Sequence, residues 1–216
     1  MSARFERVAL IGLGLIAGSM AHAMRERGLA ERISGHARSA ATRETAAEIG
    51  LVDEVTETAA EAVRDADLVV LAVPVGAMAE VAAEIAPHLA PGAILTDVGS
   101  VKQAVIDAVA PHVPAGVHFI PGHPLAGTEH SGPRSGFATL FRNRWWLLTP
   151  LPGTDEAAQA RLLALQFGQG LGDGEAEDHE RQLDRHDRHR RGHRGHGGTC
   201  PVEIVSPTST VRPSGL

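Results

Sequence analysis

Short apolar segments alternate with amphipathic ones along the first 165 residues. Residues 68–73 are continuously apolar, whereas 76–88 carries apolar residues at helical spacing. This alternation is typical of βαβ units and a parallel sheet. We therefore expect an α/β fold with a doubly wound, mostly parallel sheet. The expected strands are 7–11, 32–35, 67–73, 93–96, 117–120 and 145–149, and the expected helices are 15–27, 40–49, 57–64, 76–88, 100–109 and 155–165.

The pattern changes abruptly after residue 165. Residues 167–198 consist almost entirely of Gly, His, Arg, Asp and Glu, with four apolar residues among them. Such a stretch cannot bury enough apolar surface to offset the entropy lost on ordering. We therefore expect two parts, a folded domain over 1–165 and a disordered low-complexity tail over 166–216.

Histidines in this tail raise the question of a metal site. His186, His189, His193 and His196 have a spacing that would align them on one face of a helix and allow them to bind Zn or Ni. Glycines interrupt the segment, and no apolar stripe would hold a helix. No metal site is predicted.

Charge and cysteine content limit the classes of partner and the compartment. The formal net charge is −6 and no polybasic block is present, which argues against nucleic acid or an anionic membrane as partner. The uncharged run 8–21 is too short to span a bilayer as a helix. A single cysteine, Cys200, excludes an internal disulfide and suits the reducing cytoplasm, where we place the protein.

A glycine pattern follows the first expected strand and begins the first expected helix. Residues 12–17, Gly-Leu-Gly-Leu-Ile-Ala, fit G-x-G-x-x-G/A. Gly12 permits the tight turn, Gly14 lets the backbone approach a pyrophosphate, and Ala17 allows close packing of helix on strand. The N–H groups of the first turn, which contains Leu15 and Ile16, would bind the anion. The pattern predicts a Rossmann domain that binds a nicotinamide dinucleotide.

Two further regions complete the expected cofactor site. Val73 and Pro74, at the end of the apolar strand 67–73, are assigned to it. The second strand does not end in the acidic residue that binds a ribose 2′-hydroxyl, because the sequence there reads Gly-His-Ala-Arg-Ser over 35–39. Arg38 and Ser39 could bind a 2′-phosphate, unless Arg38 is only a solvated surface residue. NADP is therefore favoured, with NAD as the alternative.

Two segments near strand ends narrow the function. One is Asp-Val-Gly-Ser-Val-Lys at 97–102, and the other is Gly-His-Pro-Leu-Ala-Gly-Thr-Glu-His-Ser-Gly at 122–132. Ligands bind outside the carboxyl ends of strands in such sheets, so both segments are expected to face the cofactor. With Gly-Leu-Gly-Leu-Ile-Ala-Gly-Ser at 12–19, they resemble the prephenate/arogenate (cyclohexadienyl) dehydrogenase family over residues 5 to about 165.

The resemblance implies roles for four residues. His123 would accept the proton of the substrate ring 4-hydroxyl as hydride leaves C4, and Ser100 would orient that hydroxyl. Thr128 and Glu129 would lie at the substrate mouth. Histidine suits general base chemistry because its pKa lies near operating pH. Alternatively, Ser100 only caps a helix and His123 is only a turn residue. His130 is expected to be solvated.

The family's second, helical domain has no counterpart in the sequence, although the resemblance implies that it dimerises the protein and covers the substrate. We interpret the change near residue 165 as a lost reading frame in G+C-rich DNA, which would leave the chain inactive. The leading function is NAD(P)-dependent oxidative decarboxylation of prephenate or arogenate in tyrosine biosynthesis. The alternatives are a non-catalytic NAD(P)-binding fragment and another β-hydroxyacid-type dehydrogenase.

Overall fold

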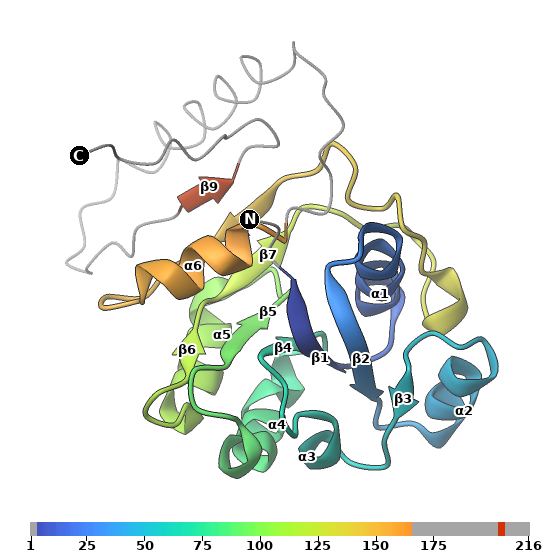
Figure 1. Cartoon of the computed structure of the whole chain (residues 1–216), viewed down its shortest axis with the longest axis horizontal. Coiled ribbons are helices and arrows are strands. Elements are labelled where there is room, and N and C mark those ends of the chain that lie inside the picture. The colour runs from blue at the N-terminus through green and yellow to red at the C-terminus, as the bar shows by residue number, and fades with distance from the viewer. Residues whose placement is uncertain (1–3, 166–202, 206–216) are drawn as a thin grey trace.

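The computed structural model describes residues 4–165 and the backbone of residues 203–205 (Figure 1). Its main sheet has six strands, all parallel, in the order β3-β2-β1-β4-β5-β6. The order reverses between β1 and β4, and this reversal is where doubly wound sheets open a crevice for ligands. The strands are β1 (Phe5–Ile11), β2 (Ala30–His36), β3 (Glu54–Val55), β4 (Leu68–Leu71), β5 (Ile94–Asp97) and β6 (His118–Phe119).

Helices cover both faces of this sheet, which confirms the predicted doubly wound fold. On one face lie α1 (Leu15–Arg27), α2 (Ala40–Glu48) and α6 (Glu156–Leu163). On the other lie α3 (Ala59–Ala62), α4 (Met78–Ile85) and α5 (Lys102–Val109). Four short 3₁₀ turns join these elements: η1 (Val75–Ala77), η2 (Ala86–His88), η3 (Ala110–His112) and η4 (Pro133–Ser135).

The continuous apolar runs of the central strands explain why two cores form. Val8 and Leu10 of β1 lie in the core under α1, whereas Ala9 and Ile11 lie in the core under α4. Successive side chains of a strand point to opposite faces, so a strand buried on both sides must be apolar at every position. The sequence pattern therefore specifies a central position for β1 and β4.

A second, antiparallel sheet contains β7 (Gly122–Pro124), β8 (Trp146–Leu148) and β9 (Glu203–Val205). Residues 122–124 lie between the expected strands 117–120 and 145–149, where no strand was expected, so this strand was missed. They pair with β8, which places His123 opposite Leu147. Residues 203–205 fall within the stretch expected to lack regular structure, and they pair with the other edge of β8. Such short strands are held by tertiary pairing, so their sequences carry little periodicity.

Helix α6 is attached to the amino ends of β1 and β4. Arg161 forms an ion pair with Asp67, and its guanidinium lies 4.3 Å from the ring centre of Phe5. Asp67 also accepts a hydrogen bond of 3.0 Å from the backbone N–H of Arg7. These contacts hold α6 at the amino ends of the strands, away from the carboxyl ends.

The loop between β7 and β8 folds back onto α1. Gly136 lies so close to this helix that an added β-carbon would meet the carbonyl carbon of Gly18 at 2.7 Å and the nitrogen of Ser19 at 2.8 Å. The backbone N–H of Phe137 donates to Ser19 Oγ at 3.1 Å. The Gly18–Ser19 pair that follows the glycine pattern therefore serves packing of this loop.

Several expectations fall outside the described residues. The tail over 166–216 is described only at 203–205, so the proposed reading-frame change remains a prediction, and the histidines at 186–196 lie outside the described residues. Within the described residues, no three His, Cys, Asp or Glu side chains are grouped to hold a metal ion. No helix in that part of the chain has the length and apolar character needed to cross a membrane.

We expect Gly136→Ala to lower the free energy of unfolding by about 1–3 kcal/mol, the usual cost of forcing an extra methyl group into a packed contact. Neighbouring backbone at 2.7–3.0 Å leaves no flexible side chain to move aside. Gly127→Ala is the matched control, because nothing lies within 4 Å of its added β-carbon. Urea unfolding of both variants measures the difference. Equal stability of the two variants would contradict the described packing.

Candidate active site

Three of the predicted site segments lie at the carboxyl end of the main sheet. The turn after β1, the segment after β4 and the loop after β5 all leave the carboxyl ends of adjacent parallel strands. Such ends meet at one edge, so segments distant in sequence become neighbours. This arrangement agrees with the prediction from sequence that these segments lie close together.

Gly12 forms the turn after β1 in a conformation reserved for glycine. Its φ is +101°, and an added β-carbon would lie 2.4 Å from the carbonyl oxygen of Ala72. Its N–H donates to the carbonyl of His36 at 2.8 Å. The turn is therefore held by backbone contacts to the segments that follow β4 and β2, and any side chain at position 12 would disrupt it.

Gly14 presents the beginning of α1 to solvent. It is the N-cap residue, and no atom lies within 4 Å of the position of an added β-carbon. No side chain caps the helix and no acidic residue occupies its first turn, so the N–H groups of this turn remain available to an anion. Leu15 and Ala17 are buried and Ile16 is half-buried. This open end fits the pyrophosphate of a dinucleotide.

Val73 and Pro74 follow β4 beside this glycine turn. Ala72, whose carbonyl faces Gly12, directly precedes them. Val73 is half-buried and Pro74 is exposed. Pro74 then begins the η1 turn, and its carbonyl accepts the N–H of Ala77 at 2.8 Å. The structure thus places both residues next to the predicted pyrophosphate position.

Arg38 and Ser39 lie in the exposed turn between β2 and α2. Arg43 shapes this turn, because its Nη1 donates to the carbonyls of Ala37 at 2.9 Å and Arg38 at 3.1 Å. The other Arg43 nitrogen, Nη2, pairs with Glu57 at 2.6 Å. Ser39 is the N-cap of α2 and makes no capping hydrogen bond through its side chain. The hydroxyl and the Arg38 guanidinium therefore face solvent at the end of β2.

A buried ion pair lies beneath the two predicted catalytic segments. Asp97, at the end of β5, is fully buried and pairs with Lys102 of α5, whose side chain is 17% exposed. Sequence reasoning assigned a role to neither residue. The available signal was composition, because Lys102 is the only lysine in the 216 residues. Burial raises the pKa of Asp97 and lowers the pKa of Lys102, and the attraction between the two charges opposes both changes.

This ion pair joins the Ser100 segment to the His123 strand. Asp97 accepts the N–H of Gly99 at 2.7 Å and the N–H of Gly122 at 3.0 Å. Lys102 Nζ donates to the carbonyl of Gly122 at 2.5 Å. Gly122 directly precedes His123, and Gly99 directly precedes Ser100. The two predicted catalytic residues therefore leave the same cluster of hydrogen bonds.

Ser100 is exposed in the bend between β5 and α5. The alternative that it caps this helix was wrong, since the N-cap is Val101 and the first helical residue is Lys102. Its side chain makes no hydrogen bond within the described residues. Its hydroxyl is therefore available to a ligand.

His123 is half-buried on β7 rather than lying in a loop. Burial is the main cause that lowers the pKa of its imidazole, and the nearby Lys102 charge adds to it. Asp97 acts in the opposite direction. A lowered pKa keeps the ring neutral near pH 7, which is the form that accepts a proton.

Thr128 and Glu129 are exposed in the loop after β7. Thr128 Oγ1 accepts the N–H of His130 at 3.2 Å, and Glu129 lies 3.5 Å from the His130 ring. The His130 side chain is 71% exposed, so its expected solvation is confirmed. Among the described residues no hydrogen bond joins Thr128 or Glu129 to Ser100 or His123. Their assignment to the substrate mouth stays a prediction.

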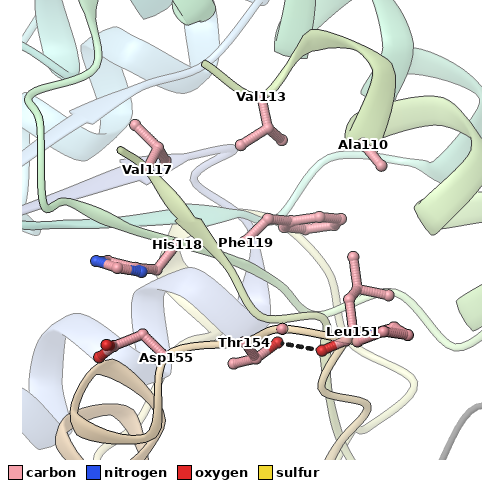
Figure 2. Close-up of a pocket in the computed structure, with 10 residues that line it drawn as sticks. Ala110, Val113, Val117, His118, Phe119, Leu151, Thr154 and Asp155 are labelled. Carbon is pink, nitrogen blue, oxygen red and sulfur yellow. Dashed lines mark hydrogen bonds between the residues drawn. The ribbon is translucent and has the colours of Figure 1, made fainter. Parts of the chain in front are cut away.

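A separate cavity of about 220 Å³ lies at the outer edge of the main sheet. Figure 2 shows His118 and Phe119 of β6 on one side of it and Leu151, Thr154 and Asp155 on the other. Two of its polar side chains are hydrogen-bonded within the protein, since Thr154 Oγ1 donates to the Leu151 carbonyl and Asp155 caps α6. None of its lining residues belongs to the predicted site.

Comparison with known proteins gives one family. The sequence profile described as "Prephenate dehydrogenase, nucleotide-binding domain" matches residues 20–168. The cyclohexadienyl dehydrogenase of Zymomonas mobilis subsp. mobilis is 40% identical over 188 residues, which cover 84% of this chain and 63% of that protein.

Two solved structures support the same likeness. Synechocystis arogenate dehydrogenase has a TM-score of 0.67 at 34% identity, covering 74% of this chain and 55% of that one. A. aeolicus prephenate dehydrogenase, in complex with hydroxyphenyl propionate and NAD+, has a TM-score of 0.69 at 28% identity, covering 76% and 57%. The chain thus spans less than two thirds of each of these proteins.

We expect Gly14→Val to leave the fold intact and to weaken dinucleotide binding by at least about tenfold, because the added side chain would occupy the approach of the pyrophosphate. Open space around Gly14 removes any clash within the protein itself. Fluorescence titration with NADPH measures binding, and thermal unfolding checks the fold. Gly12→Ala is the contrasting variant, since its β-carbon would collide with Ala72 and destabilise the protein. Unchanged cofactor affinity in a folded Gly14→Val protein would remove the glycine turn from the cofactor site.

Proposed function

The chain belongs to the prephenate dehydrogenase family, and we propose that, when joined to the helical second domain that the resemblance implies, it oxidatively decarboxylates prephenate or arogenate with NAD(P)+, a reaction of tyrosine biosynthesis. The observation that carries this proposal is the joining of the Ser100 and His123 segments by the Asp97–Lys102 pair beside the glycine turn. A dinucleotide turn alone fits many oxidoreductases. A half-buried, neutral histidine at this edge adds a base suited to oxidation of an alcohol.

We assign the residues the roles that the family resemblance implies. His123 accepts the proton of the ring 4-hydroxyl, and Ser100, exposed nearby, orients that hydroxyl. Removal of the proton pushes electrons toward departure of hydride from C4, and loss of CO₂ then makes the ring aromatic. When bound, the nicotinamide ring supplies the hydride acceptor. Thr128 and Glu129 contact the substrate from the exposed loop.

Cofactor binding is assigned to the beginning of α1 and the turns around it. Gly12, Gly14, Leu15, Ile16 and Ala17 hold the pyrophosphate against the helix N-terminus. Val73 and Pro74 border the same crevice. Arg38 and Ser39 bind a 2′-phosphate, so NADP is preferred over NAD.

The oligomeric state and the location of the whole enzyme are further predictions. The family resemblance implies a homodimer, and the single cysteine implies a cytoplasmic location. A non-catalytic dinucleotide-binding protein is the competing function. Binding of NADPH without turnover of either substrate would favour that alternative.

In a version of the chain joined to the family's helical second domain, we expect His123→Asn to lower turnover of prephenate or arogenate roughly 10²- to 10⁴-fold, the usual contribution of a general base, while cofactor affinity stays within about twofold. Appearance of NAD(P)H absorbance on addition of each substrate measures turnover. His118→Asn is the matched control, because this histidine lies on β6 at the other cavity. Turnover by His123→Asn close to that of the unmodified protein would exclude His123 as the base.

We expect Arg38→Ala to weaken NADP+ binding by about one to two decades and to leave NAD+ binding nearly unchanged. A hydrogen bond to a charged group contributes about 1.5–3 kcal/mol, and only NADP+ carries the 2′-phosphate. The ratio of the two dissociation constants is the measured quantity. Arg64→Ala removes an exposed arginine after α3 and serves as control. If the ratio stays constant in Arg38→Ala, the cofactor preference lies elsewhere.

A further inference from the structure

The Asp97–Lys102 pair lies under His123, the proposed base, and is largely shielded from solvent. We propose that this pair is a positioning element of the reaction: it fixes the backbone on both sides of the site and keeps a positive charge beside the His123 ring. The inference rests on the proposed function for its catalytic meaning, whereas its structural content can be measured without any turnover.

Asp97 organises two segments from one fully buried carboxylate. Oδ2 accepts the Gly99 N–H and the Lys102 ammonium, and Oδ1 accepts the Gly122 N–H. A buried carboxylate is costly unless it is paired and hydrogen-bonded, so all these donors are needed together. Movement of either loop would leave a buried charge incompletely satisfied. The carboxylate therefore resists separation of the Ser100 segment from the His123 strand.

Lys102 completes the connection from the opposite side. Its ammonium reaches both Asp97 and the carbonyl of Gly122, so Gly122 is bound through its N–H and its carbonyl. Every other basic Lys or Arg position in the chain is arginine. An ammonium is a compact donor, whereas a guanidinium is a wider planar fork. The narrow space between Asp97 and Gly122 accounts for lysine at this one position.

The position of the His123 backbone follows from this arrangement. Gly122 is fixed by the pair, and His123 itself is opposite Leu147 in the β7–β8 ladder. An added β-carbon at Gly122 would lie 3.0 Å from the Asp97 carbonyl and 2.6 Å from Trp146 Nε1, so the strand sits tightly at this point. The charged groups that act on His123 in the described part of the chain are Lys102 of α5 and Asp97 of β5. Leu147, its partner on β8, carries no charge.

A purely structural role for the pair makes a different prediction. Replacing a buried ion pair with neutral groups is often tolerated without loss of stability. If the pair served stability alone, its removal would change unfolding and leave the titration of His123 as it was. If it serves the site, removal of the ammonium raises the pKa of His123, because a nearby positive charge disfavours the imidazolium.

The experiment follows the His123 ring in the 216-residue protein by ¹H–¹³C NMR from pH 4.5 to 9. The His123→Asn spectrum assigns its signal. We expect Lys102→Met to raise the pKa of His123 by about half a pH unit or more, and Lys102→Arg, which keeps the charge, to leave it closer to that of the unmodified protein. Arg134→Met removes a charge from an exposed ion pair with Glu48 and should not move it. An unchanged pKa in folded Lys102→Met would overturn the proposal.

Two further measurements apply if Lys102→Met fails to fold. The neutral double variant Asp97→Asn/Lys102→Met avoids an unpaired buried charge. Because Asp97 raises the pKa of His123 and Lys102 lowers it more strongly, this variant should raise the pKa by less than is expected for Lys102→Met, and a lowered pKa there counts against the proposal. In the unmodified protein, the Gly99 and Gly122 amides should exchange with deuterium at least about tenfold more slowly than that of exposed Gly127. Equal exchange at all three would overturn the positioning role.

Turnover separates this inference from the proposed function. With active protein, Lys102→Met should lower kcat while the KM for NADP+ stays within about twofold. In a version joined to the helical second domain, absence of turnover together with a rise in the pKa of His123 in Lys102→Met would contradict the proposed function and support the role of the pair. Unchanged kcat in folded Lys102→Met would contradict the role of the pair alone.

Discussion

Parallel pairing of six strands is the constraint on which the other features depend. Because all six run in one direction, the chain must return across the sheet after each strand, and every strand delivers its carboxyl end to the same edge. Gly12, Val73, Ser100 and the residues around them come from separate strands, yet they lie along this edge. The two apolar cores stabilise this arrangement. Helix α1 begins shortly after β1 ends, and α5 begins shortly after β5 ends.

At the carboxyl end of the sheet, one region leaves polar groups open to solvent and another encloses charged groups. At the beginning of α1, unpaired N–H groups are left open to solvent, and their positive potential attracts an anion. Beneath His123 the charges are enclosed and matched, with Asp97 satisfied by Gly99, Gly122 and Lys102. The first region leaves hydrogen-bond donors open to an anion, and the second encloses a matched pair of charges next to the His123 strand.

Sequence reasoning located the fold and the glycine turn because both depend on local pattern. The helix at 15–27 was predicted with the same bounds as α1, since Gly28 ends it in a left-handed conformation. β7 was missed because its three residues pair only with a distant strand, and no periodicity marks so short a segment. The importance of Asp97 and Lys102 was missed because burial of a charge is a tertiary property. The motif at 97–102 contains both residues, but it does not show that they pair with each other out of contact with solvent.

The contact between Gly12 and the Ala72 carbonyl has an evolutionary consequence. The frame of the cofactor turn is made of backbone against backbone, so its shape owes little to the side chains around it. Replacement of the surrounding side chains would therefore leave this frame in place. Position 12 must lack a β-carbon and so must be glycine, whereas the side chains around the turn can vary.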